Sequence, residues 1–83
     1  RELEHIMKER RSYVANRAEG GDIVPLADGT PLNITAQIIV PIVAGGDCLG
    51  AVSLLSAEEG ARMENSAVKL CRLTADILAN QFE

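Results

Sequence analysis

The chain has 83 residues, enough for one domain at most, and carries a net charge of −4 from 8 basic and 12 acidic side chains. This charge, together with an aromatic fraction of only 2%, argues against the basic surface and stacking rings typical of nucleic-acid-binding domains. With 47% hydrophobic residues in so short a chain, we expect apolar surface to remain after folding and to favour association.

The first 18 residues have the spacing of an amphipathic helix. Apolar side chains recur at three- and four-residue intervals, and Gly20 and Gly21 follow as a stop signal, so we predict a helix from Arg1 to about Ala18. Its single histidine, His5, has no partner at a metal-ligand spacing and is read as a solvent-facing residue. Three arginines could hold an anionic ligand or could form a solvated, ion-paired face: Arg10, Arg11 and Arg17.

Residues 22–33 are predicted to be a connector that climbs over the sheet. Pro25 interrupts regular structure, Asp28-Gly29 is a turn signal, and Thr30-Pro31 disfavours helix. Such a connector can line a binding site or can simply wrap the core.

The stretch Ile34–Ser56 has a strong β-hairpin signal. Two runs of β-branched and aliphatic residues flank Gly45-Gly46, which can adopt the positive φ angles of a two-residue turn. With these two glycines as the turn, Ala44 faces Asp47 and the register continues without a break. Pro41 lacks an N–H, so a strand on its far side must bulge, stop short or be absent.

Neither face of this hairpin is charged, so both faces must be covered. In the unbroken register, one face has small residues that suit a closely approaching helix, and the other could floor a pocket. The alternative is that both faces are ordinary core. The first face comprises Ala36, Ile38, Val40, Ile42, Leu49, Ala51, Ser53 and Leu55, and the second comprises Gln37, Ile39, Pro41, Val43, Cys48, Gly50, Val52 and Leu54.

A final helix is predicted from near Met63 to about Gln81, with two adjacent apolar seams. Together the seams are wider than one sheet contact requires, so either part of the arc meets a second chain or the helix has one wide buried face. One seam is Met63, Ala67, Leu70, Thr74, Ile77 and Gln81; the other is Val68, Cys71, Ala75, Leu78 and Phe82.

The sequence contains no assembled catalytic or metal-binding motif. It has no G-x-G-x-x-G, Walker, H-E-x-x-H or G-x-S-x-G pattern, and Cys48 and Cys71 read as isolated buried thiols of a reducing compartment. It has no signal-peptide, transmembrane or lipidation pattern. We therefore expect a cytoplasmic protein that is not an enzyme, binds no metal or cofactor and does not contact a membrane.

The stretch Val40–Val52 resembles the central hairpin of GAF domains, with a Pro-Ile strand, a glycine turn and a Leu-Gly-Ala-Val strand. The likeness extends through the Leu3–Arg11 helix, with its Glu-Arg-Arg-Ser end, and through the closing Ala67–Gln81 helix. Together these segments are similar to the C-terminal GAF domain of the stage V sporulation protein T family of AbrB-type transcription regulators. The resemblance covers nearly the whole chain.

The resemblance implies an α+β fold, namely a partial GAF-like domain with an antiparallel hairpin sheet covered by helices and a long C-terminal helix. Residues 1–83 would be a regulatory domain lacking its first helix and first two strands, with DNA bound only through an N-terminal domain outside this chain. The implied function is signal sensing and oligomerisation in a bacterial sporulation regulator of the forespore, with an unknown small-molecule effector.

Two other functions remain open: a protein–protein interaction module with no small ligand, and a cysteine-dependent reductase of the kind found among some GAF domains. An uncovered hairpin edge invites pairing with another chain, so we expect a homo-oligomer, a dimer or higher. The candidate ligand pocket lies between the first helix, the connector and the sheet, and comprises Arg11, Tyr13, Gln37, Ile39 and Val52. The candidate oligomer interface comprises Leu70, Ile77, Leu78 and Phe82 of the last helix.

Overall fold

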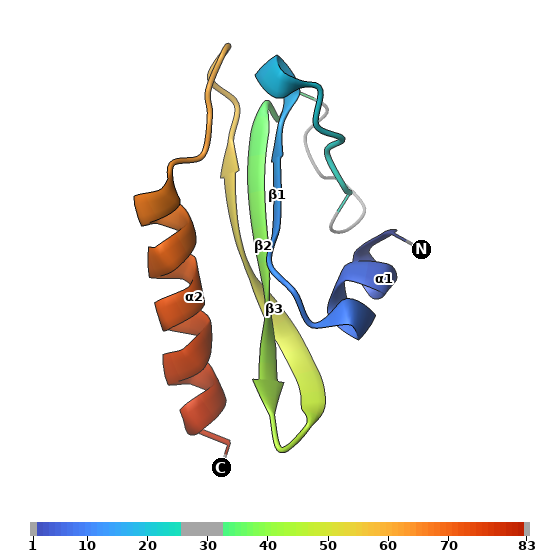
Figure 1. The fold of residues 1–83 in the computed structure, drawn as a ribbon, viewed down its shortest axis with the longest axis vertical. Coiled ribbons are helices and arrows are strands. Elements are labelled where there is room, and N and C mark those ends of the chain that lie inside the picture. The colour runs from blue at the N-terminus through green and yellow to red at the C-terminus, as the bar shows by residue number, and fades with distance from the viewer. Residues whose placement is uncertain (1, 26–32, 83) are drawn as a thin grey trace.

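The computed structural model describes residues 2–25 and 33–82, which form a three-stranded antiparallel sheet with one helix on each face (Figure 1). The strand order β1-β2-β3 places β2 at the centre of the sheet. This arrangement confirms the predicted α+β class and its long C-terminal helix. In chain order the elements are α1 (Glu2–Glu9), β1 (Tyr13–Asn16), the short 3-10 helix η1 (Arg17–Glu19), β2 (Ala36–Ala44), β3 (Asp47–Ser56) and α2 (Asn65–Asn80).

The prediction of one helix up to Ala18 is wrong. Helix α1 ends at Glu9 because Arg10 turns into the left-handed region, with φ 58°, and donates its N–H to the Ile6 carbonyl at 3.1 Å. The chain then extends, and β1 pairs with β2 from Tyr13 to Asn16. The helical spacing of this segment was outweighed by the backbone hydrogen bonds that the edge of β2 offers to an aromatic and β-branched strand.

The predicted hairpin and its glycine turn are confirmed. Gly45 and Gly46 have φ angles of 59° and 84°, and Ala44 opposes Asp47 across the turn. Only glycine takes both of these angles at little steric cost, which is why the turn could be located from the sequence.

The predicted unbroken register is wrong beyond the first two pairs of the hairpin. Val43 opposes Cys48 as expected, but Ile42 then opposes Gly50, so Leu49 is an extra residue with no partner. This is a β-bulge, in which two residues of one strand oppose one residue of the other. The missing side chain of Gly50 makes the bulge easy to accommodate.

The bulge exchanges the faces of β3, because a shift of one residue reverses the side to which every later side chain points. Val52 and Leu54 oppose Val40 and Ile38, and so lie on the same face as these two residues rather than with Gln37. The predicted faces therefore hold for β2 but are wrong for β3 beyond the bulge.

The pairing of β1 with β2 stops short of Pro41, which is one of the three outcomes predicted from the sequence: a bulge, a strand that stops short or no strand. Strand β1 begins at Tyr13, which pairs with Ile39, and on the β1 side of β2 the described residues provide no strand beside Val40 to Ala44. Since Pro41 has no N–H to donate, continued pairing along this edge would lose a hydrogen bond. The uncovered edge becomes one wall of the cleft described below.

Each face of the sheet has its own core. On the α2 side, Ile38 and Val40 pack with Cys71 and Ala75, and these small α2 residues allow the helix to lie close to β2. On the α1 side, the core is a cluster of Ile6, Val24 and Ile39. The extended segment 21–25 thus contributes a buried residue to the α1 side, while residues 26–32, including the predicted Asp28-Gly29 turn, lie outside the described part of the chain.

Candidate functional site

An open cleft of about 580 Å³ lies beside the N-terminal end of β1, where the edge of β2 is uncovered. Its walls are the turn between α1 and β1, the β2 edge and one flank of α2. Its volume is in the range of small-ligand sites. We call it the arginine cleft, and it is lined by Arg10, Arg11, Ser12, Val40, Pro41, Val43, Arg72 and Asp76.

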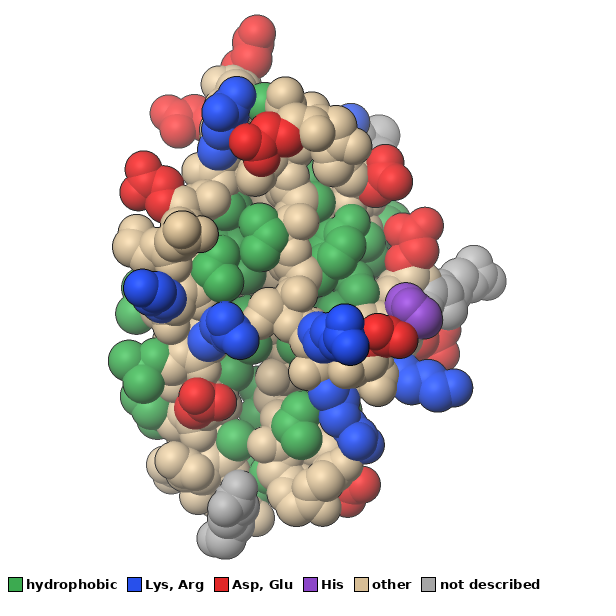
Figure 2. All heavy atoms as spheres, viewed as in Figure 1, with side chains coloured by type: hydrophobic (Ala, Val, Ile, Leu, Met, Phe, Trp, Pro, Cys, Tyr) green, Lys and Arg blue, Asp and Glu red, His purple; other side chains and the backbone are tan. Residues whose placement is uncertain are grey.

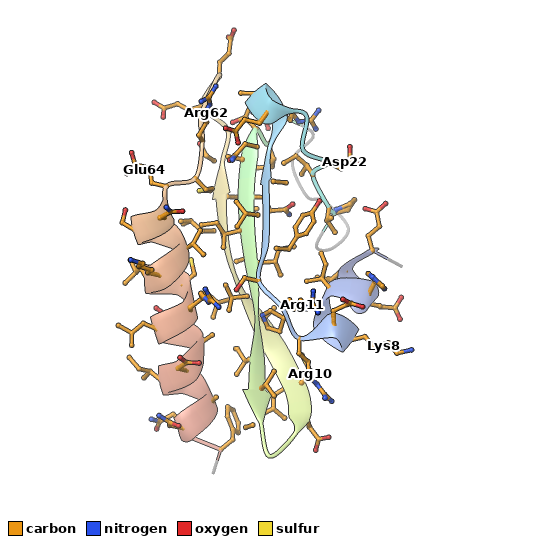
Figure 3. The ribbon with its side chains drawn as sticks, in the orientation of Figure 1. Lys8, Arg10, Arg11, Asp22, Arg62 and Glu64 are labelled. Atoms are coloured by element: carbon orange, nitrogen blue, oxygen red, sulfur yellow. The ribbon has the colours of Figure 1, made fainter. Side chains whose placement is uncertain are left out.

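Three arginines from two separate parts of the chain line the arginine cleft. Arg10 and Arg11 lie where α1 turns toward β1 (Figure 3), and Arg72 comes from α2. Figure 2 shows basic side chains in a band across the middle of this face of the molecule. Within residues 2–25 and 33–82, none of the three guanidinium groups has a carboxylate at ion-pair distance or a side-chain hydrogen bond. Asp76 also lines the cleft, which therefore holds three positive charges and one negative charge.

The backbone of Arg10 is unusual for its residue type. It is the only non-glycine residue with a positive φ in the described ranges, and it occupies the position after a helix where glycine is common. An L-residue with a side chain in this conformation costs about 1 kcal/mol relative to glycine. The chain thus has an arginine at a position whose backbone conformation favours glycine.

The structure brings together only part of the predicted ligand pocket. Arg11 and Tyr13 line a hollow of about 180 Å³ beside α1, and Tyr13 also lines an adjoining apolar hollow of about 420 Å³. Gln37 and Ile39 lie on this same face but are completely buried. Val52 lies on the opposite face, with the α2 core, because of the bulge. Ligand binding by the other four residues, Arg11, Tyr13, Gln37 and Ile39, stays a prediction.

Gln37 has a structural role. Its Oε1 accepts the Val24 N–H at 2.8 Å, and its Nε2 donates to the Val24 carbonyl at 2.7 Å. The side-chain amide therefore pairs with Val24 as a neighbouring strand would. This pair holds the segment 21–25 against the α1 side of the sheet.

The phenol of Tyr13 donates a hydrogen bond of 2.6 Å to the Asp22 carbonyl. The pKa of Tyr13 is raised above its usual value, chiefly by burial and further by the negative charges of Asp22 and Glu2. The folded chain therefore favours the neutral phenol.

We expect the Tyr13 phenol to make folding sensitive to alkali. In the unfolded chain tyrosine ionises near pH 10, but in the folded chain it ionises at a higher pH. Its contribution to stability is thus fully present below about pH 10 and is lost as the pH rises above that value. Urea unfolding at about pH 8 and at about pH 10.5 tests this. Between these two pH values, the free energy of unfolding should fall less for Tyr13→Phe than for the wild type. Equal losses in both proteins would contradict the expectation.

Other predicted polar residues lie away from the cleft. Arg17 Nε donates to the Ile34 carbonyl at 2.7 Å, so its side chain joins η1 to the start of β2. His5 lies on the exposed surface of α1, 3.8 Å from Glu9, as expected for a solvent-facing helix residue. Arg72 was not a sequence candidate, because its place in the cleft depends on where the pairing of β1 with β2 leaves the edge of β2 uncovered.

The outer surface of α2 carries a second candidate site. Leu70, Leu73 and Ile77 are 63%, 56% and 53% exposed, while Cys71 and Ala75 face the sheet. Figure 2 shows hydrophobic side chains along the edge of α2 that faces away from the sheet. We call Leu70, Leu73 and Ile77 the α2 stripe. The alternative of one wide buried face does not hold in the single chain.

The other two residues of the predicted oligomer interface are also exposed. Leu78 is 40% exposed and Phe82, just past the end of α2, is 67% exposed. Leu73 was missed because the predicted seams alternate steps of three and four residues and pass from Leu70 to Thr74.

The structure offers little support for redox or metal chemistry within its described ranges. No group of three or more His, Cys, Asp or Glu residues there could hold a metal ion. Cys71 is buried in the aliphatic α2 core, whereas Cys48 is half-buried and its Sγ is 3.5 Å from the Gly50 carbonyl. In these same ranges no helix is long and apolar enough to span a membrane.

The fold is a small α+β domain with an open, arginine-lined cleft and an exposed apolar stripe on α2. The chain belongs to the family of the stage V sporulation protein T C-terminal domain, described as a transcription factor, whose model matches residues 1–83. It is thus a domain of a sporulation transcription factor. A comparison with curated proteins found no match.

Proposed function

We propose that this chain is a GAF-like, signal-sensing and self-associating module of a bacterial sporulation transcription regulator that acts in the cytoplasm. The family supports the regulatory setting, and the two surfaces support the two activities. The arginine cleft is the candidate for sensing, and the α2 stripe is the candidate for assembly. Contact with DNA would belong to another part of the regulator, since this chain has a net charge of −4.

The α2 stripe is the observation that carries the assembly proposal. Three large aliphatic side chains, more than half exposed, lie on the helix face opposite the core. Isolated exposed leucines are ordinary, but a continuous stripe at helical spacing is typical of a helix that packs against another. A second copy of the same helix is the simplest partner, because a twofold axis lets one surface pair with itself.

The charges beside the stripe fit an antiparallel pair of α2 helices. Lys69 and Asp76 are exposed and seven residues apart, and therefore lie on the same side of α2. With a twofold axis near Leu73, Lys69 of one copy comes opposite Asp76 of the other copy. Each dimer would then have two such charge pairs along the edge of its apolar contact.

Light scattering after gel filtration tests the assembly. We expect a dimer for the wild type and at least tenfold weaker association for Leu73→Asp, because the variant places two carboxylates in the centre of an apolar contact. Circular dichroism checks that the variant is folded, which we expect because Leu73 is 56% exposed and is not part of the α2-side core cluster.

The matched control is Leu49→Asp, the same change at an exposed leucine of the β3 bulge. It should leave the dimer intact. A monomeric wild type would refute the proposal. So would a Leu49→Asp variant that becomes monomeric while Leu73→Asp stays dimeric, because the copies would then meet along β3.

The alternative function, an interaction module with no small ligand, differs from this proposal only in the role of the arginine cleft. It predicts a dimer whose thermal stability is the same with and without small anions. A raised melting temperature in the presence of a bound ligand would favour the sensor.

A further inference from the structure

We propose that the arginine cleft binds a small organic phosphate through Arg10, Arg11 and Arg72. This inference deepens the proposed sensing role by giving the chemical class of the ligand. It rests on that role for its biological meaning, although binding can be measured independently of assembly.

The charge of the cleft is the first argument. Three guanidinium groups share one cleft with a single carboxylate, Asp76, and none of the three forms an ion pair among the described residues. Like charges held close together repel, and a bound anion relieves that repulsion. The lining thus has a net charge of +2, from three arginines and Asp76, which is opposite and equal to the charge of a phosphate monoester.

The chemistry of arginine favours phosphate over a monovalent anion. A guanidinium group is planar and can donate two parallel hydrogen bonds to two oxygens of one phosphate. The Ser12 hydroxyl lines the same cleft and can donate one more hydrogen bond. Donors from the α1–β1 turn and from α2 would thus reach one anion from two sides.

The remaining lining explains why the ligand would be an ester rather than the free ion. Val40, Pro41 and Val43 form an apolar wall, and the cleft volume of about 580 Å³ exceeds what one phosphate ion would fill. Pro41 offers no N–H to a polar ligand. An organic group attached to the phosphate could pack against this wall while the arginines hold the charged end.

The conformation of Arg10 is an independent observation for the same site. Its positive φ is unfavourable for an arginine, and the backbone bond from its N–H to Ile6 would form equally with glycine. Strained residues of this kind are concentrated at ligand sites. A binding role for the side chain accounts for an arginine at this position.

A DNA backbone is a poorer fit than a small ligand. The domain has a net charge of −4, and Figure 2 shows acidic side chains around the basic band. A duplex would have to approach those acidic groups, whereas a small molecule can enter the cleft alone.

The test is isothermal titration calorimetry of the chain with phenyl phosphate and with inorganic phosphate at constant ionic strength. We expect both probes to bind, phenyl phosphate more tightly. Arg11→Gln and Arg72→Gln should each weaken binding about tenfold or more, because each removes a charged donor. Arg62→Gln is the matched control, since Arg62 lies outside the cleft, 3.6 Å from Glu19, and its loss should leave the affinity unchanged.

Four results would overturn the proposal. These are no binding of either probe at roughly millimolar concentration, inorganic phosphate binding more tightly than phenyl phosphate, an equal loss of affinity in Arg62→Gln, or a short DNA duplex that binds more tightly than phenyl phosphate. Repeating the titration on Leu73→Asp separates this inference from the assembly proposal, because Leu73 does not line the cleft. Binding without dimerisation refutes only the assembly, and dimerisation without binding refutes only the cleft.

Discussion

Replacing Gln37 with alanine should cost about 3–5 kcal/mol of unfolding free energy. The Val24 N–H and carbonyl, which Gln37 now satisfies at 2.8 and 2.7 Å, would be left without their partners in a buried place. Each such group costs about 1–3 kcal/mol, and the lost side chain also leaves a cavity. Domains of this size have a total stability of about 5–15 kcal/mol, so the variant would lose a large share of it.

Urea unfolding followed by circular dichroism measures this loss. Gln81→Ala is the matched control, because Gln81 is the only other glutamine in the chain and is exposed at the end of α2. Surface changes of that kind usually stay within about 0.5 kcal/mol. If Gln37→Ala and Gln81→Ala lost similar amounts of unfolding free energy, the paired hydrogen bonds to Val24 would not be important for the stability of the fold.

The parts of this fold that could be predicted are those decided by local chemistry. The Gly45-Gly46 turn follows from the backbone angles that glycine allows, and α2 follows from a long periodic pattern. Pro41 even predicted that a neighbouring strand would bulge, stop short or be absent, because a missing N–H has the same effect in any sheet, and the structure shows the second of these outcomes.

The parts that could not be predicted depend on contacts between distant segments. Residues 13–16 have a helical spacing, and only the open edge of β2 makes them a strand. The bulge at Leu49 is invisible in the alternating pattern, yet it moves Val52 to the other face and out of the predicted pocket. Arg10 and Arg11 could be suspected from their charge, but Arg72 joins them only because α2 lies beside the uncovered part of β2.

Replacing Ile39 with alanine should release α1 before the rest of the chain unfolds. Ile38 and Ile39 are adjacent and both completely buried, but they point to opposite faces and belong to different cores. Truncation of either should cost about 2–5 kcal/mol. The loss at Ile39 falls on α1, which has eight residues and a single buried residue, Ile6, and is too short to be stable alone.

Native-state hydrogen exchange distinguishes the two variants. In Ile39→Ala we expect faster exchange mainly in α1 and at Val24, with α2 still protected, whereas Ile38→Ala should speed exchange throughout the chain. The same pattern in both variants would show that the two cores unfold as one unit. Because Arg10 and Arg11 directly follow α1, Ile39→Ala should also weaken phosphate binding while the α2 stripe, and with it the dimer, stays intact. The α1–β1 side of the cleft would then become mobile while the exposed face of α2 stays firm.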